Sequence, residues 1–99
     1  SRARVDQMPD TPTLAESGLP GFEAVGWFGI VGPAGMPPAV VAKLNAAFVT
    51  ALREPEVRER IIAVGAFPRP MTPEEFRAFL GADVEKWRQV VKATGAKAE

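Results

Sequence analysis

The sequence predicts an α/β fold that is mostly helical, with one main strand and a short edge strand, as part of something larger. First, an eleven-residue apolar run, Phe22–Gly32, lies between clusters of Pro and Gly and carries one charge, the pattern of a strand covered on both faces. Second, three later segments repeat apolar residues every three or four positions, as amphipathic helices do. Third, a strand of this kind needs neighbours in a sheet, and the remaining sequence hardly supplies them.

The segment before this strand is expected to form a short helix over residues 11–18. Thr11 is the expected N-cap, Pro12 suits the first helical position, and Gly18 suits the left-handed conformation that ends a helix. Residues 19–21, with the sequence LPG, then turn the chain. We therefore expect a well-defined loop here.

The main strand is expected over residues 22–31. Successive side chains of a strand point to opposite faces, and both faces are largely apolar here. Glycine inside a strand marks a bulge or a close backbone approach. One face presents Phe22, Ala24, Gly26, Phe28 and Ile30, and the other presents Glu23, Val25, Trp27, Gly29 and Val31.

Prolines mark the starts of the next two helices. Pro37 and Pro38 preset φ for a helix, which is expected to run to Arg53. Pro55 begins a second helix, because a proline inside the first would cost about 3 kcal/mol. Gly65 is the expected C-cap of that second helix. The apolar stripes comprise Val41, Leu44, Phe48, Ala51 and Leu52 in the first helix, and Val57, Ile61 and Val64 in the second.

A short extended segment and a long helix complete the chain. Residues 66–70 contain two prolines, so they are expected to be an edge strand or a strap. Thr72 caps the last helix, Pro73 takes its first position, and Glu75 completes a capping box. Gly95 is expected to end it. We expect Trp87 to be a core residue. It belongs to the apolar stripe of this helix, which is Phe76, Leu80, Val84, Trp87 and Val91.

Composition excludes several classes of function. Twelve basic and twelve acidic residues cancel, so the chain lacks the positive charge that nucleic acids and anionic membranes attract. No apolar run approaches the roughly 20 residues of a membrane span, and the first ten residues lack the apolar core of a secretory signal. His, Cys and Tyr are absent, and Ser17 is in no nucleophile motif. We therefore expect no enzyme, no metal site and no cofactor.

The stretch from Met8 to Phe48 resembles a known family. Its spacing of Pro, Gly, Trp and Asn is similar to that of the C-terminal part of the Bug receptors, the periplasmic solute-binding proteins (TctC-type) of tripartite tricarboxylate transporters. The later segments PEVRERIIAVG and TPEEFRAFL also resemble the family, so the resemblance covers nearly all 99 residues. Met36 departs from it, since a small Thr is usual there. The matching residues are Pro9, Asp10, Pro12, Thr13, Glu16, Gly18, Trp27, Gly29, Pro33, Gly35, Pro37, Leu44 and Asn45.

The resemblance implies a two-lobed periplasmic-binding-protein fold (type II-like) whose lobes close around a small carboxylate. Residues 1–21 would finish the second lobe, 22–33 would be the strand that crosses between lobes, and 34–99 would be the C-terminal helical part of the first lobe. The parent protein would be periplasmic, would bind a small organic acid without chemical change, and would deliver it to the membrane components of the transporter. No cofactor and no direct membrane insertion are implied.

Five residues are candidate ligand contacts. Asp10, Thr11 and Thr13 lie at a helix start, where backbone N–H groups meet anions, and Trp27 and Phe28 lie where the lobes would meet. Simpler interpretations stay open, because a Thr or Asp at a helix start also acts as a cap and aromatic side chains also pack in cores.

A different class of function is also open. The chain would then be a stand-alone interaction module without a small-molecule ligand, which self-associates through the edge of the strand at residues 22–31. On this interpretation the isolated segment forms a homodimer or a swapped oligomer.

Overall fold

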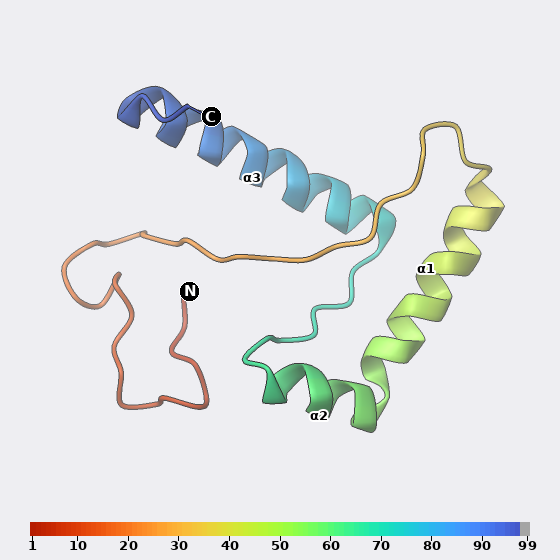
Figure 1. Cartoon of the computed structure of the whole chain (residues 1–99), viewed down its shortest axis with the longest axis horizontal. Helices are drawn as coiled ribbons and strands as arrows, with labels where there is room; N and C mark the ends of the chain where they lie inside the picture. Colours follow the sequence, from red (N-terminus) through yellow and green to blue (C-terminus); the bar gives the residue numbers. More distant parts are fainter. Residues whose placement is uncertain (98–99) are drawn as a thin grey trace. The chain divides into compact units, whose positions relative to one another are not determined.

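The computed structural model describes residues 1–97, and its regular secondary structure is helical (Figure 1). The chain divides into two compact units, one over Ser1–Gly32 and one that begins at Pro33. The first unit consists of turns and an extended segment, and the second contains all the helices of the described chain. These are α1 (Pro38–Arg53), α2 (Pro55–Ala63) and α3 (Pro73–Thr94).

The structure corrects the first predicted helix, which is a single turn. Its cap is Thr13 rather than Thr11. The Thr13 hydroxyl accepts from the backbone N–H of Glu16 at 3.2 Å, and the Glu16 carboxylate accepts from the Thr13 N–H at 2.8 Å. This reciprocal pair needs a Glu three residues after the cap, a spacing that Thr13 has and Thr11 lacks. Gly18 follows in a positive-φ conformation (106°) and ends the turn.

Neither predicted strand is formed in residues 1–97. Residues 22–33 follow an extended path (Figure 1) and form no strand ladder within residues 1–97. Residues 66–70 likewise have no regular structure, and their two prolines have no N–H to donate. A strand exists only as part of a ladder, and the described residues provide no partner for one. Both predicted strands are therefore segments without a strand ladder in the described residues.

Helices α1 and α2 start where the prolines predict. Pro37 precedes α1 with an extended ψ of 134°. The chain breaks between the helices at Glu54, where ψ is 128°, because Pro55 cannot continue a helix. The C-cap of α2 is Val64 rather than Gly65. Gly65 follows with φ of 79°, a left-handed conformation that glycine adopts without strain.

Helix α3 has both ends that the sequence predicts. The Thr72 hydroxyl accepts from the Glu75 N–H at 3.1 Å, and the Glu75 carboxylate accepts from the Thr72 N–H at 2.8 Å. This is the expected capping box. At the other end Gly95 is left-handed (φ 67°), and its N–H donates to the Val91 carbonyl at 2.9 Å. Local chemistry therefore fixes both ends of this 22-residue helix.

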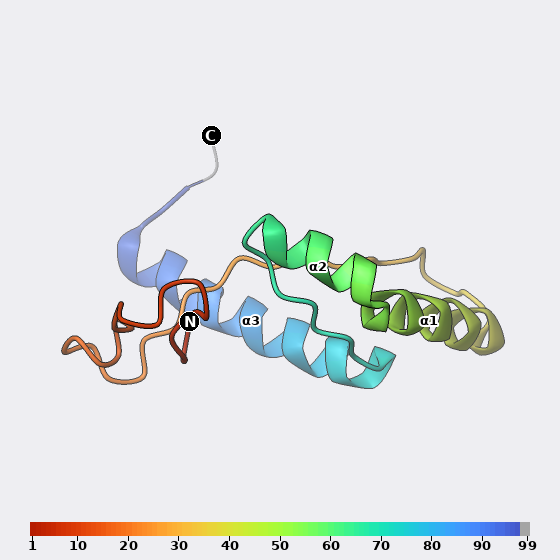
Figure 2. The same cartoon turned by 90° about the horizontal axis from the view of Figure 1, so that it is seen from below.

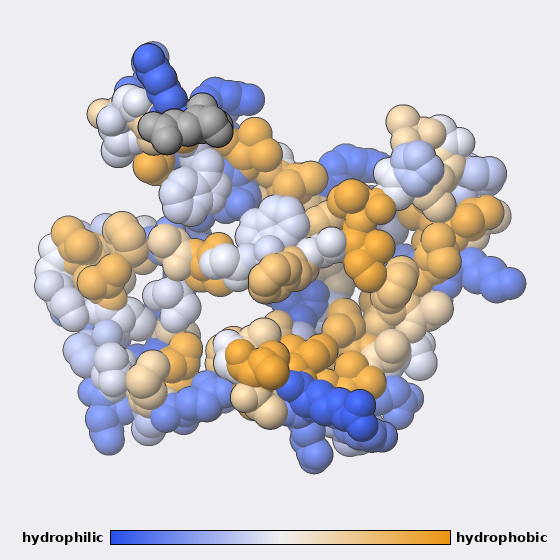
Figure 3. All heavy atoms as spheres, in the orientation of Figure 1, coloured by the Kyte–Doolittle hydropathy of each residue, from blue (hydrophilic) through white to orange (hydrophobic). Residues whose placement is uncertain are grey.

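The helices leave much of their apolar surface open. Helix α1 contacts both α2 and α3. The N-terminal half of α3 lies near α1 while its C-terminal half projects away (Figure 1 and Figure 2). No apolar side chain of residues 1–97 is fully buried, and Figure 3 shows apolar side chains at the surface over the helices. The prediction that Trp87 is core is wrong, since it is 42% exposed in the uncovered half of α3.

Candidate functional site

Arg4 and Glu16 form a clamp that closes the first loop of the chain. The Arg4 guanidinium donates to both Glu16 carboxylate oxygens from Nε at 3.1 Å, and to Oε1 from Nη2 at 2.9 Å. Its Nη1 donates to the carbonyl of Pro9 at 3.1 Å. A forked, charge-assisted contact of this kind restrains geometry more than a single hydrogen bond does. The clamp therefore ties the two ends of the loop 4–16 together.

Thr13 is the least exposed residue of the loop, at 9%. Its N–H and hydroxyl make the reciprocal bonds to Glu16. Its carbonyl accepts from the Ser17 N–H at 3.1 Å and from the Ser17 hydroxyl at 2.8 Å. Every polar group of Thr13 is thus engaged in holding the turn, although its hydroxyl proton stays available to a further acceptor.

The clamp also sets the ionisation of its members. The Arg4 hydrogen bonds, together with the N–H of Thr13, lower the pKa of the Glu16 carboxyl from 4.5 to about 2. In return the carboxylate raises the pKa of the Arg4 guanidinium above its usual value. Hydrogen bonds to a charged form favour that form. The loop is therefore closed by a fully ionised pair at neutral pH.

Asp10 and Thr11 lie at the exposed side of this loop. They follow Pro9, whose carbonyl is held by Arg4, and the Thr11 N–H donates to the Met8 carbonyl at 3.1 Å. Their backbone is thus restrained from both directions while both residues stay exposed. That arrangement suits contacts with a partner outside the loop.

Trp27 and Phe28 lie on the extended segment of the same unit. Trp27 is 37% exposed and Phe28 is completely exposed. The structure thus brings Asp10, Thr11 and Thr13 together in one restrained loop and places the two aromatic residues on a separate segment.

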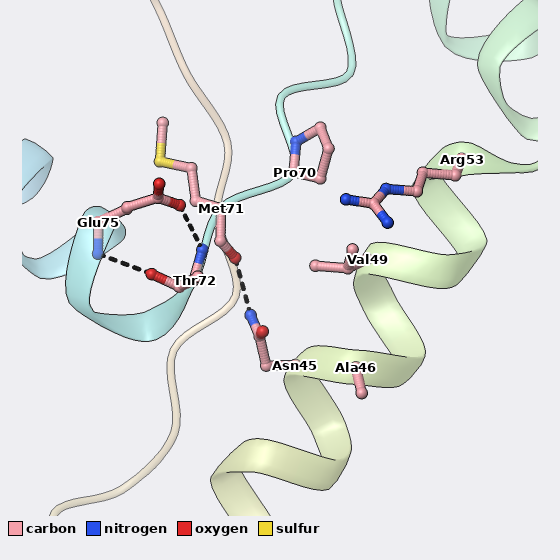
Figure 4. Close-up of a pocket in the computed structure, with 8 residues that line it drawn as sticks. All are labelled: Asn45, Ala46, Val49, Arg53, Pro70, Met71, Thr72 and Glu75. Carbon is pink, nitrogen blue, oxygen red and sulfur yellow. Dashed lines mark hydrogen bonds between the residues drawn. The ribbon is translucent and has the colours of Figure 1, made fainter.

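The second unit contains a pocket between α1 and the start of α3 (Figure 4). Its volume is about 180 Å³. The side-chain amide of Asn45 donates to the carbonyl of Met71 at 2.9 Å, which ties the middle of α1 to the residue before the α3 cap. The lining residues are Asn45, Ala46, Val49, Arg53, Pro70, Met71, Thr72 and Glu75.

Most polar groups of this pocket form hydrogen bonds within the protein. Thr72 and Glu75 bond each other in the capping box, and the amide of Asn45 is used by Met71. The Arg53 guanidinium points into the space in Figure 4. Among residues 1–97 no group of three His, Cys, Asp or Glu side chains is placed to hold a metal ion.

Sequence reasoning missed the partners of two residues. Glu16 was noted only as a matching residue, although the Thr13-x-x-Glu16 spacing is itself a capping signal. Nothing in the sequence pairs it with Arg4, twelve positions away. The bond from Asn45 to Met71 spans 26 positions. Its only sequence signal is a polar residue on the half-buried stripe of α1, which bears Val41, Asn45, Val49 and Leu52.

Residues 1–96 match the family described as "Tripartite tricarboxylate transporter family receptor". The chain belongs to this receptor family. The TctC (Bug) family relationship predicted from the sequence is thus confirmed.

Several curated relatives support the match. Protein BugT of Bordetella pertussis is 38% identical over 97 residues, covering 98% of this chain and 30% of BugT. A UPF0065 protein in the tcbD-tcbE intergenic region of Pseudomonas sp. strain P51 is 36% identical over 89% of this chain and 26% of its own length. A UPF0065 protein in the TAR-I ttuE-ttuC' intergenic region of Agrobacterium vitis is 35% identical over 96% of this chain and 28% of its own length. The chain therefore spans under a third of the length of these relatives.

The family is known by its location, its fold and its partners. The family consists of periplasmic transport receptors with a periplasmic-binding-protein fold, which work with the membrane components of tripartite transporters. No helix within residues 1–97 combines the length and apolarity needed to cross a bilayer. No solved structure matches the chain.

Proposed function

We propose that this chain is part of an extracytoplasmic solute receptor that binds a small carboxylic acid and delivers it, unchanged, to a tripartite tricarboxylate transporter. The observation that carries the proposal is the match of residues 1–96 to the receptor family. On this proposal the chain works in the periplasm, and its partners are the organic acid and the membrane components of the transporter.

We assign the parts of the chain to lobes on the same basis. Residues 1–21 would end the second lobe, 22–33 would cross between lobes, and 34–99 would complete the first lobe. The apolar segment at 22–33, which forms no strand ladder within residues 1–97, supports this assignment, because a crossing strand takes its ladder partners from sequence elsewhere in a receptor.

The proposed ligand contacts are the exposed residues Asp10 and Thr11 of the clamped loop, the buried Thr13 of the same loop, and the aromatic pair Trp27 and Phe28. A loop whose backbone is restrained before ligand arrives loses less entropy on binding. The Arg4–Glu16 clamp supplies such restraint.

Isothermal titration with a panel of dicarboxylates and tricarboxylates tests the proposal. A polypeptide of receptor length that contains this sequence should bind one of these acids, and the 99-residue chain alone should bind weakly or not at all. Thr11→Val should weaken binding, whereas Thr50→Val, the same change at an exposed position of α1, should not. Absence of binding to every acid tested would overturn the proposed function. Tight binding by the 99-residue chain alone would overturn the division of the site between lobes.

A second candidate, a stand-alone self-associating module without a small-molecule ligand, is favoured by one specific observation. No apolar side chain of residues 1–97 is fully buried, so the chain as described has apolar surface for a partner to cover.

A further inference from the structure

The loop at residues 4–16 contains one arginine, and its guanidinium is already bound within the chain. Arg4 donates from Nε and Nη2 to the carboxylate of Glu16, at 3.1 and 2.9 Å. Its Nη1 donates to the carbonyl of Pro9 at 3.1 Å. The negative charge of Glu16 offsets the positive charge that would otherwise attract a carboxylic acid. Arg4 is therefore poorly suited to be the counter-ion of an acidic ligand.

The other arginine of the same unit is also paired. Arg2 forms an ion pair with Glu23, and the unit Ser1–Gly32 contains no further arginine, no lysine and no histidine. Both side-chain cations of this unit are thus held by its own glutamates. A contribution of Arg4 to ligand binding must therefore come from the geometry that it imposes rather than from free positive charge.

Arg4 restrains the middle of the loop as well as its end. Among residues 1–97, the one side-chain hydrogen bond to the backbone of residues 5–12 comes from Arg4, at the Pro9 carbonyl. A backbone turn follows at once, in which the Thr11 N–H donates to the Met8 carbonyl at 3.1 Å. Without the guanidinium this backbone would be free to move, and ordering it on ligand binding would cost conformational entropy.

The clamp is better suited to fixing geometry than to stabilising the whole fold. The side chains of Arg4 and Glu16 are 44% and 46% exposed, and ion pairs that solvent reaches contribute little to global stability. A forked guanidinium–carboxylate contact, however, restrains direction as well as distance. Loss of the clamp should therefore loosen this loop while the rest of the protein stays folded.

We propose that Arg4 and Glu16 are positioning residues of the ligand site, which fix the backbone of Asp10 and Thr11 before the acid arrives and do not themselves bind its carboxylate. The assignment rests on the proposed function, because it takes Asp10 and Thr11 to be ligand contacts. It adds to that function two residues that act through the loop rather than on the ligand.

Calorimetric titration of a receptor-length polypeptide with succinate, malate and citrate tests the assignment. Arg4→Met removes every donor of the guanidinium and keeps an unbranched side chain. It should raise the dissociation constant of the bound acid about three- to tenfold, since the loop must then be ordered during binding. Arg2→Met is the matched control, because it removes the other arginine–glutamate pair of the same unit, and it should change the affinity little. Equal affinities of Arg4→Met and the unmodified receptor, or equal weakening by Arg2→Met, would overturn the assignment.

Glu16→Gln separates positioning from direct contact with the acid. Glutamine can still serve in the capping turn with Thr13, but it lacks the charge that holds the guanidinium. If Arg4 bound the acid itself, this change would free its positive charge and tighten binding. Positioning predicts weaker binding instead, and it predicts that Arg4→Met combined with Glu16→Gln costs less than the two changes added together. Tighter binding by Glu16→Gln, or strict additivity, would overturn the assignment.

Hydrogen exchange followed by mass spectrometry reports on the loop itself. In the unmodified receptor, peptides that cover residues 5–12 should exchange similarly with and without the acid, because the loop is already ordered. In Arg4→Met their exchange should be faster without the acid and should slow when it is added, while α3 stays unchanged. Unchanged exchange in residues 5–12 would overturn the positioning role, and so would faster exchange throughout the protein.

The assignment and the proposed function fail in different ways. An unmodified receptor that binds none of the acids would overturn the proposed function, and the positioning role would fall with it. An unmodified receptor that binds an acid, beside an Arg4→Met variant that binds it equally well, would overturn the positioning role alone.

Discussion

Replacing Thr72 by Ala tests whether the capping box holds the start of α3. The substitution removes the acceptor of the Glu75 N–H at 3.1 Å and leaves the returning carboxylate bond at 2.8 Å without its counterpart. Loss of a Thr N-cap costs about 1 kcal/mol, within a range of 0.5–2. Met71, beside the cap, accepts the Asn45 bond, and losing that bond through fraying would add ~0.5–1.5 kcal/mol. We therefore expect a loss of about 1 kcal/mol in the free energy of unfolding if only the cap is lost, and about 1.5–2.5 kcal/mol if the Asn45 bond is lost with it.

The assay is thermal and urea unfolding followed by the helical signal in far-ultraviolet circular dichroism. A loss of 1 kcal/mol lowers Tm by roughly 4–8 °C in a domain of this size. Thr94→Ala is the matched control in the last turn of the same helix, where the Thr94 hydroxyl donates to the Val90 carbonyl at 2.9 Å. Such back-bonding adds little stability, and Ala is the better helix former. The control should therefore leave stability unchanged or slightly higher.

A double-mutant cycle makes the reasoning refutable. The two bonds of the box are reciprocal, so Thr72→Ala combined with Glu75→Ala should cost less than the two single changes added together. Equal destabilisation by Thr72→Ala and Thr94→Ala would show that the cap is not the cause. Strict additivity of the double variant would show that the two bonds do not act as a unit.

The remaining predictions concern the loop clamp and two glycines. Because the pKa of Glu16 falls from 4.5 to about 2 in the folded loop, its contribution to loop order is present above pH 4.5 and is lost as the pH falls toward 2. NMR titration of the Glu16 carboxyl should show this, and Arg4→Gln should return the pKa toward its usual value; a titration unchanged by that variant would disprove the clamp. Gly65→Ala should destabilise the chain by about 1–2 kcal/mol, because residue 65 is left-handed. Gly81→Ala, inside α3 with nothing within 4 Å of an added Cβ, should stabilise it by about 0.5–1 kcal/mol. Unfolding curves that rank these two glycine variants in the opposite order would refute that comparison.

The helix ends could be predicted because their causes lie within a few residues. The φ of Pro55 and the three-residue spacing of Thr72 and Glu75 act whatever the rest of the fold does. The proline rule misplaced the first cap, because Thr11 is followed by Pro12 as at a helix start. The spacing rule gives the observed cap, since only Thr13 has a Glu three residues later. The family relationship could also be predicted from the sequence, since it rests on Pro, Gly and Trp residues at fixed spacing along the chain.

The candidate site could be predicted from the sequence only in part. The loop containing Asp10, Thr11 and Thr13 was located, but its closure by Arg4 was not, because an ion pair across twelve residues leaves no periodic signal. The link from Asn45 to Met71, across 26 residues, was likewise beyond local reasoning.

The sequence by itself determined where the helices start and stop, and to which receptor family the chain belongs. Only the tertiary structure decided that Trp87 stays exposed on the outer half of α3 and that residues 22–33 form no strand ladder within residues 1–97. The reason is physical. A cap or a proline is satisfied by its own neighbours, whereas a core and a ladder require a second surface, and residues 1–97 supply neither a buried core nor a ladder.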